Sequence, residues 1–143
     1  MTERASHVPV TTTRYWPDGK IWKVTDSENH DTVTNTYYGD GSLKQVKDAA
    51  NHVTEYTYNG FMALDTTTYP DSTYELLTYD DYRRLSEKRG RSGQTISFTY
   101  DRLNRVTTKT VTDPNDLSST ITYQYDLLGR LYKTIDGSGT TKE

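Results

Sequence analysis

The chain has 143 residues, a net charge of -3 and 31% hydrophobic residues, which is below the roughly 45–50% of a typical globular chain. It contains 13 Tyr, 2 Trp and no Cys, so disulfides and thiolate metal sites are excluded and the aromatic content argues against a disordered chain. No run approaches the roughly 20 apolar residues of a membrane helix, and the charge balance gives no reason to expect nucleic acid as a partner.

Residues 1–14 precede the first repeat and are predicted to form a tail or an added edge strand. They lack the apolar core of a signal peptide, because Thr, Glu, Arg and His interrupt the stretch. A repeat array occupies residues 15–143, where a seven-residue segment recurs six times at a period of about 21 residues. Each copy opens with a tyrosine and carries an aliphatic residue six positions later. These repeat anchors are Tyr15 and Ile21, Tyr37 and Leu43, Tyr58 and Leu64, Tyr79 and Leu85, Tyr100 and Val106, and Tyr125 and Leu131.

Each repeat is predicted to contain two short strands. In the strand that runs into the anchor tyrosine, Ile96, Phe98 and Tyr100 alternate with hydroxyl residues, which indicates one buried and one exposed face. The tyrosine ring would pack on the buried face while its hydroxyl remains in water. The second strand returns from the aliphatic anchor. No segment keeps a helical period, so we expect an all-β fold, an antiparallel ribbon of about twelve strands in about six hairpin repeats.

A first turn follows each anchor tyrosine. Four copies have Gly or Asn at its fifth position, counted from the tyrosine, where a positive φ is tolerated: Gly19, Gly41, Asn104 and Gly129. Met62 and Arg83 hold this position in the other two copies, so those turns are expected to be strained or differently built, with Gly60 as the substitute for Met62. Three copies place an aspartate directly after the tyrosine, at Asp80, Asp101 and Asp126. We expect these carboxylates to cap turn N–H groups rather than to catalyse, because no nucleophile shares their phase.

The segment Tyr125–Leu131 reads Tyr-Asp-Leu-Leu-Gly-Arg-Leu and closely resembles the YD repeat of the Rhs family, which includes bacterial Rhs toxins, the C subunits of insecticidal toxin complexes and teneurins. Tyr79–Leu85 and Tyr100–Val106 match in part, and the resemblance extends over residues 15–143. It implies a ribbon that curls as part of a hollow β-shell, which encloses a toxin or effector domain or scaffolds a cell-surface protein. A secreted or cell-surface location is implied as well.

The resemblance also implies partners. They are the rest of such a shell, or another copy of the chain joined through open strand edges, and an enclosed toxin domain. The chain is expected to be a piece of the shell wall. Neither membrane insertion, a cofactor nor an enzymatic activity is predicted.

Few residues suggest chemistry of their own. His30 and His52 occupy equivalent positions and are interpreted as turn residues rather than metal ligands. The stretch Arg83–Lys109 is rich in basic residues. It fits either a patch for sulfated glycan or nucleic acid, or arginines that pair with neighbouring aspartates, and the pairing is favoured.

The aromatic side chains give the main binding hypothesis. Exposed aromatic rings stack on sugars, and Trp16 and Trp22 are the tentative glycan contacts. An alternating tyrosine row, however, more often forms the buried face of a sheet. The predicted function is therefore a non-catalytic structural repeat module, and a carbohydrate-binding module is the alternative.

Overall fold

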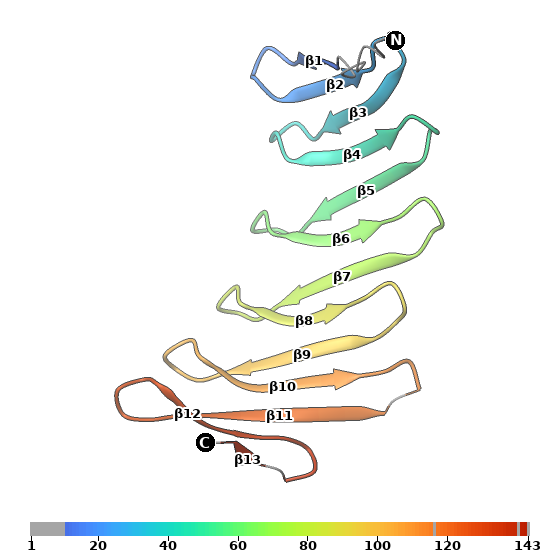
Figure 1. Ribbon diagram of the computed structural model, residues 1–143. Coiled ribbons are helices and arrows are strands. Elements are labelled where there is room, and N and C mark those ends of the chain that lie inside the picture. The colour runs from blue at the N-terminus through green and yellow to red at the C-terminus, as the bar shows by residue number, and fades with distance from the viewer. Residues whose placement is uncertain (1–10, 116, 140, 143) are drawn as a thin grey trace, which may run out of the picture. The chain divides into compact units, whose positions relative to one another are not determined.

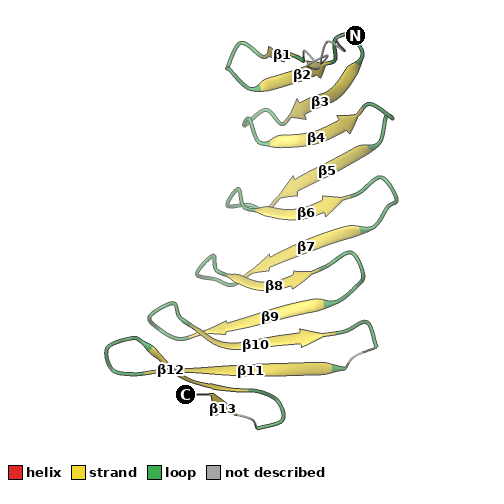
Figure 2. Ribbon diagram, viewed as in Figure 1, coloured by secondary structure: helices red, strands yellow, loops and turns green. Residues whose placement is uncertain are grey.

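The computed structural model describes residues 11–115, 117–139 and 141–142 (Figure 1). The first ten residues of the predicted tail lie outside the described residues. The described residues form 13 β-strands with antiparallel pairing and no helix (Figure 2). The predicted all-β, antiparallel fold is confirmed. This part of the chain accordingly offers no helix that is long and apolar enough to cross a membrane.

The chain divides into two compact units, one made of residues 1–57 and 67–72 and the other of residues 58–66 and 73–143. In the first unit, consecutive strands pair with each other: β1 (Thr12–Tyr15), β2 (Ile21–Thr25), β3 (Asp31–Tyr37), β4 (Leu43–Asp48) and β5 (Val53–Tyr58). Strand β6 (Leu64–Thr68) is divided between the two units. The second unit continues with β7 (Tyr74–Tyr79), β8 (Leu85–Arg89), β9 (Thr95–Tyr100), β10 (Val106–Thr112), β11 (Ser118–Tyr125), β12 (Leu131–Ile135) and β13 (Thr141–Lys142), again paired in chain order.

The turns share one backbone plan. After Tyr79, the N–H of Arg83 donates to the carbonyl of Asp80 at 2.8 Å, and the N–H of Asp80 donates to the carbonyl of Arg84 at 2.9 Å. Arg83 has a φ of 63°. A short loop that ends in such a left-handed residue produces a bulge, and the register shifts between Thr78 and Tyr79. The other turns place a positive φ at Gly19, Asn29, Gly41, Asn51, Met62, Ser72, Gly93, Asn104, Gly129 and Gly139.

Among the described residues no hydrophobic side chain is fully buried, and the buried residues are Thr25 and Thr67. The prediction that Ile96, Phe98 and Tyr100 form a buried face is therefore wrong in degree, because all three are only half-buried. The physical reason is that, among the described residues, each strand contacts its neighbours in the sheet and contacts with a covering layer are not found. Because hydrophobic stabilisation scales with the apolar area removed from water, contacts along the sheet must contribute a larger share here.

Candidate functional site

The anchor tyrosines join each repeat to the one before it. In four copies the tyrosine hydroxyl donates a hydrogen bond to the backbone carbonyl of the preceding repeat's aliphatic anchor. These bonds run from Tyr37 to Ile21 at 2.9 Å, Tyr79 to Leu64 at 2.8 Å, Tyr100 to Leu85 at 2.7 Å and Tyr125 to Val106 at 2.8 Å. The expectation that the hydroxyl remains in water is wrong for these copies. The hydroxyl instead satisfies a carbonyl at the start of a strand, where the bulge interrupts the ladder.

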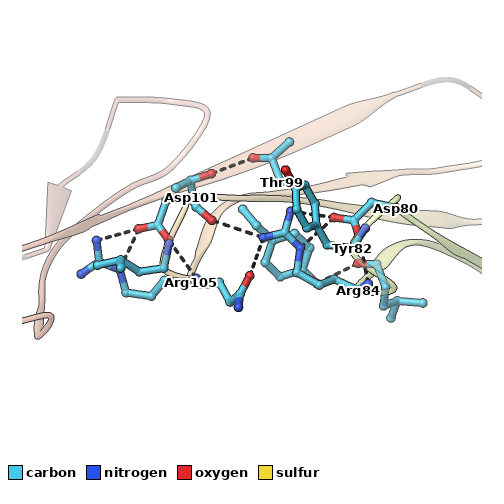
Figure 3. Close-up of polar contacts among 11 residues, drawn as sticks. Asp80, Tyr82, Arg84, Thr99, Asp101 and Arg105 are labelled. Carbon is cyan, nitrogen blue, oxygen red and sulfur yellow. Dashed lines mark hydrogen bonds and ion pairs between the residues drawn. The ribbon is translucent and has the colours of Figure 1, made fainter.

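The aspartate after the anchor tyrosine fixes the turn (Figure 3). Oδ1 of Asp80 accepts hydrogen bonds from the N–H groups of Tyr82 and Arg84, both at 2.9 Å. Asp101 and Asp126 accept the equivalent pairs of N–H groups at 2.8 to 3.0 Å. The predicted capping role of these three carboxylates is confirmed, and it accounts for the spacing of aspartate in the motif.

The arginine before the aliphatic anchor connects its own turn to the next repeat. Nε of Arg84 donates to Oδ2 of Asp80 at 2.7 Å, and the guanidinium lies 4.4 Å from the centre of the Tyr100 ring. Arg105 lies over the Tyr125 ring at the same distance. The predicted pairing of motif arginines with neighbouring aspartates is confirmed. The stacking adds a cation–π contact of roughly 0.5–2 kcal/mol that the sequence did not suggest.

Hydrogen bonding keeps these aspartates ionised. The Arg84 side chain, followed by its backbone N–H, holds the pKa of Asp80 below the ordinary value of 3.8. The pKa values of Asp101 and Asp126 are lowered chiefly by the backbone N–H of the arginine in the same turn, with a further contribution from its side chain. A carboxylate whose pKa is lowered in this way is a poor proton donor or acceptor at neutral pH, so the three residues suit a structural role.

The first two repeats build the same turn from other side chains. Their aspartates stand two positions later, at Asp18 and Asp40, immediately before the glycine of the turn. Oδ2 of Asp18 pairs with Lys20 at 2.6 Å, and the lysine Nζ lies 5.6 Å from the centre of the Tyr37 ring. Asp40 accepts hydrogen bonds from the N–H and hydroxyl groups of Ser42 at 2.8 and 2.6 Å. Lys20 therefore contacts the tyrosine of the next repeat as Arg84 does, but at 5.6 Å from the ring centre instead of 4.4 Å.

The fifth position of the turn meets the basic residue of the preceding repeat. The side-chain oxygen of Asn104 accepts a hydrogen bond from Nη1 of Arg84 at 2.9 Å. A Cβ added to Gly129 would lie 3.6 Å from Nη1 of Arg105, and one added to Gly41 would clash with the lysine of the first repeat. The position must accommodate both a left-handed backbone and a neighbouring cation.

Met62 and Arg83 occupy the fifth position with the same backbone as glycine, at φ values of 67° and 63°. Strain is therefore present, since a left-handed conformation costs an ordinary residue roughly 1–2 kcal/mol. The alternative in which Gly60 replaces Met62 is wrong, because Gly60 does not adopt a positive φ. The turn is instead held by Asn59, whose side-chain oxygen takes the place of the aspartate and accepts the N–H groups of Phe61 and Ala63 at 3.2 and 3.1 Å.

The exposed anchors belong to the first and last copies. Tyr15 is 60% exposed, Ile21 39% and Leu131 51%. The remaining anchors are half-buried: Tyr37, Leu43, Tyr58, Leu64, Tyr79, Leu85, Tyr100, Val106 and Tyr125.

Trp16 and Trp22 lie together, with ring centroids 5.6 Å apart. Trp16 is 44% exposed and borders a groove of about 470 Å³ in the first unit. Trp22 does not line this groove and instead has Nζ of Lys23 5.4 Å from its ring centre. The other side chains that line the groove include Asp18, Lys20, Tyr37, Tyr38 and Asp40.

The two histidines lie in equivalent turns, His30 between β2 and β3 and His52 between β4 and β5. The N–H groups of His30 and His52 donate to the carboxylates of Asp26 and Asp48 at 2.8 and 2.9 Å, so the turn interpretation is confirmed. In the described part of the chain, no cluster of three or more His, Cys, Asp or Glu side chains could hold a metal ion.

The contact between the Arg84 guanidinium and the Tyr100 ring lies in a segment that matches a known family model. Residues 79–116 match the model of the RHS Repeat family. In sequence, this segment is similar to an RHS repeat. It contains the stacking of Arg84 on Tyr100 and two of the three aspartate-capped turns. A comparison with curated proteins finds no match for the chain.

Several solved structures share the fold of almost the whole chain. The Photorhabdus luminescens Tc holotoxin pore with a mutant TccC3 aligns with 90% of the chain at a TM-score of 0.70 and 19% identity. The TcdB2-TccC3-Cdc42 structure aligns with 93% at 0.61 and 17% identity, and TcdB2-TccC3 without its hypervariable C-terminal region aligns with 93% at 0.62 and 16% identity. The chain spans only 8 to 9% of the length of these chains.

Sequence reasoning missed the hydrogen bond that joins neighbouring repeats. A signal was available, because every copy has tyrosine and none has phenylalanine at the anchor, although a phenylalanine ring would fill the same half-buried space. The consistent use of tyrosine instead of phenylalanine indicates that the hydroxyl group has a polar partner nearby. The partner itself depends on how neighbouring strands are staggered, which the spacing alone does not give.

Proposed function

We propose that the chain is a non-catalytic wall segment of an Rhs-type β-shell that encloses a toxin or effector domain. The observation that carries the proposal is the joint between repeats, in which a tyrosine hydroxyl binds a carbonyl and a basic side chain lies over the tyrosine ring. In four cases the backbone carbonyl of an aliphatic anchor accepts the tyrosine hydroxyl of the next repeat. The same joint therefore adds repeats in one direction for as long as the pattern continues, as a wall built from one ribbon requires.

The similar structures support a toxin context, since they include a holotoxin pore and complexes of TcdB2 with TccC3. The partners of this chain would then be the other repeats of the same shell and the domain that the shell encloses. A secreted or cell-surface location fits such a product. The turn carboxylates support a structural role, because arginine and backbone N–H groups already occupy them.

Protease protection tests the wall. The complete reading frame that contains these codons is expressed, with and without Arg84→Ala combined with Tyr100→Ala, which opens one joint. We expect the segment beyond the repeats to resist protease in the wild type and to be cleaved in the double variant. Leu103→Ala, at an exposed turn position, is the control and should keep the protection. Equal cleavage of wild type and double variant, or a frame with nothing beyond the repeats, would overturn the proposal.

The Trp16 groove supports a second candidate function, the binding of a neutral carbohydrate. It combines three aromatic rings with the carboxylates of Asp18 and Asp40. The pKa of Asp18 is lowered by hydrogen bonds from Lys20, and that of Asp40 by hydrogen bonds from Ser42, so both stay ionised and can accept from sugar hydroxyls. Aromatic faces with convergent polar groups in a concave site are the usual form of a small-ligand pocket.

Glycan-array binding of the purified chain tests this candidate. Trp16→Ala should abolish any signal, because it removes the exposed ring of the groove. Tyr82→Ala removes a still more exposed aromatic ring, which lies in the second unit, and should leave binding unchanged. No binding by the wild type, or equal binding by both variants, would leave the chain with its structural role alone.

A further inference from the structure

We propose that Asn59 is a site of spontaneous deamidation, and that its conversion to aspartate completes the Tyr-Asp motif of the repeat that begins at Tyr58. The inference concerns covalent chemistry within one turn, so it goes beyond the proposed wall function and does not depend on it.

Asn59 is followed by Gly60, and this is the one Asn-Gly pair in the 143 residues. Deamidation begins when the backbone nitrogen of the next residue attacks the side-chain carbonyl carbon of asparagine. Glycine has no side chain to hinder this approach. Gly60 is exposed, and a Cβ added to it would meet nothing within 4 Å, so water has access to the reacting atoms.

The attacking nitrogen is free in this turn. The N–H of Asn59 donates to the carbonyl of Ala63 at 2.9 Å, and the N–H of Met62 donates to the carbonyl of Asn59 at 3.0 Å. The N–H groups of Phe61 and Ala63 donate to the Asn59 side chain. Among the N–H groups of residues 59–63, that of Gly60 is the one without an acceptor in the described part of the chain. An N–H group that is not held in a hydrogen bond gives up its proton to solvent base more readily.

The two N–H groups that cap the Asn59 side chain favour the same reaction. They lie 3.2 and 3.1 Å from Oδ1, the atom on which negative charge develops when the Gly60 nitrogen adds to Cγ. Fixed backbone N–H groups at such an oxygen stabilise the tetrahedral intermediate in the manner of an oxyanion hole. The turn therefore combines a free nucleophile with a polarised carbonyl group.

The reaction balances with water as its co-reactant. Solvent base removes the Gly60 N–H proton, the nitrogen bonds to Cγ of Asn59, and the Cγ–Nδ2 bond breaks as the amide nitrogen takes up protons and leaves as ammonia. Water then opens the resulting cyclic imide. Cleavage of the new N–Cγ bond gives aspartate, whereas cleavage of the bond to the main-chain carbonyl carbon gives isoaspartate. Asparagine and water thus become an acidic residue and ammonia, without oxidation or reduction.

Aspartate at position 59 fits the turn that is already present. Asp80, Asp101 and Asp126 each accept the N–H groups two and four residues later, at 2.8 to 3.0 Å. An ionised carboxylate makes stronger hydrogen bonds to these groups than a neutral amide does. Isoaspartate would add one carbon to the main chain of the turn and disturb its hydrogen bonds, so the folded turn favours aspartate.

The structure also sets Asn59 apart from other asparagines. Asn35 lies within strand β3, which is paired on both sides. Three further asparagines lie in turns and precede a residue whose N–H is bound by an aspartate: His30 after Asn29 donates to Asp26 at 2.8 Å, His52 after Asn51 to Asp48 at 2.9 Å, and Arg105 after Asn104 to Asp101 at 3.0 Å. In these turns the attacking nitrogen is engaged and belongs to a residue with a bulky side chain.

Peptide mapping by mass spectrometry tests the inference on the purified chain during incubation in mildly alkaline buffer. We expect Asn59 to convert at least about tenfold faster than Asn29, Asn51 or Asn104, with aspartate as the main product and release of ammonia. The chain unfolded in urea is the comparison. It keeps the Asn-Gly pair but loses the two N–H donors, so the folded chain should convert Asn59 at least as fast.

Gly60→Ala is the matched variant. Gly60 does not adopt a positive φ and has room for a Cβ, so the turn should persist, which circular dichroism checks, while conversion slows about tenfold or more because the approach to Cγ is hindered. Asn59→Asp provides the reference for the product in chromatography. Equal rates at Asn59 and the other turn asparagines would overturn the proposal. An Asn59 amide that persists in the folded chain but converts in urea would overturn it as well, and neither result bears on the wall proposal.

Discussion

The repeats that begin at Tyr79, Tyr100 and Tyr125 and those that begin at Tyr15 and Tyr37 reach one backbone geometry by two routes. The later repeats have aspartate at the second position and arginine at the sixth, with the cation 4.4 Å from the next ring where that ring is present. The earlier ones have aspartate at the fourth position and lysine or serine at the sixth, with the lysine 5.6 Å from the ring. Both groups keep the left-handed fifth residue and the tyrosine-to-carbonyl bond. The backbone plan is therefore the essential feature of the repeat, and the capping side chain is interchangeable.

The family model matches residues 79–116, which contain two of the three copies with the aspartate–arginine pair, and it includes neither the first two repeats nor Tyr125–Leu131. The aspartate–arginine pair is absent from the turns of the first two repeats. The structure shows that Tyr37 still bonds to the carbonyl of Ile21 and lies near Lys20, although the first repeat lacks the aspartate–arginine pair.

The largest effect should come from removing a joint tyrosine from each group. Tyr100→Ala loses the hydroxyl bond to Leu85 and the ring under Arg84, and should cost about 2 kcal/mol of unfolding free energy, less than a fully buried aromatic because the ring is half-buried. Tyr37→Ala, with its more distant lysine, should cost about 1.5 kcal/mol. Urea unfolding followed by circular dichroism measures both. Thr99→Ala, at an exposed position, should cost less than about 1 kcal/mol, and a loss equal to that of Tyr100→Ala would contradict this assignment.

A reciprocal exchange of the basic residues sharpens the comparison. Arg105→Lys removes the forked contact with Asp101 and the close stacking on Tyr125, and should cost about 1 kcal/mol. Lys20→Arg in the first unit should gain only about 0.3 kcal/mol, because its aspartate is differently placed and the pair is exposed. Chemical denaturation of both variants gives the values. If both Arg105→Lys and Lys20→Arg lowered the unfolding free energy, or both raised it, the roles assigned here to arginine and lysine would be wrong.

A smaller, stabilising effect is expected from relieving strain in the Met62 turn. Met62→Gly should raise the unfolding free energy by about 0.5 kcal/mol, because the relief of a left-handed φ exceeds the entropy that glycine adds to the unfolded chain. Gly129→Ala, with a φ of 81° in the later group, is the opposite substitution and should destabilise. Thermal melts of the two variants test the pair, and a destabilising Met62→Gly would refute the strain.

The smallest effect per residue concerns pH. The pKa values of Asp80, Asp101 and Asp126 are lower in the folded chain than their ordinary value of 3.8. On acidification the unfolded state therefore takes up protons first, so the stabilisation is complete above about pH 4 and is lost as the pH falls through the folded pKa values. Urea midpoints should be level between pH 5 and 7 and decline below about pH 4. Asp101→Asn should show a shallower decline than the wild type, and an unchanged slope would exclude this carboxylate as a contributor.

Much of the fold could be predicted from the sequence because each strand and turn is specified by residues close together in the chain. The alternation around Phe98 and Tyr100 and the turn residues at Gly41 and Gly129 each specify a strand or a turn within a few residues. The capping role of Asp101 could be predicted for the same reason, since a carboxylate at the start of a turn binds N–H groups two and four residues later.

Burial could not be predicted in this way. Alternation shows which side chains share a face, but whether that face is covered depends on a second layer that no residue of a hairpin encodes. The stacking of Arg84 on Tyr100 likewise depends on the stagger between repeats. The prediction that Gly60 takes the positive φ was wrong because a glycine tolerates this conformation without requiring it. The hydrogen bonds to the side chain of Asn59 decide which residue of the turn becomes left-handed.

The four hydrogen bonds from anchor tyrosines to carbonyls point back along the chain, across only 15 to 19 residues. A repeat emerging from the ribosome can therefore close onto the repeat already made, without waiting for any sequence still to be synthesised. Folding of this kind has low contact order and exposes only one growing edge at a time, which limits the opportunity for misassembly. Nascent chains stalled at successive lengths should gain protease resistance in steps of one repeat, each step following the release of a new anchor tyrosine. Synthesis and assembly would then proceed in the same direction and at the same pace.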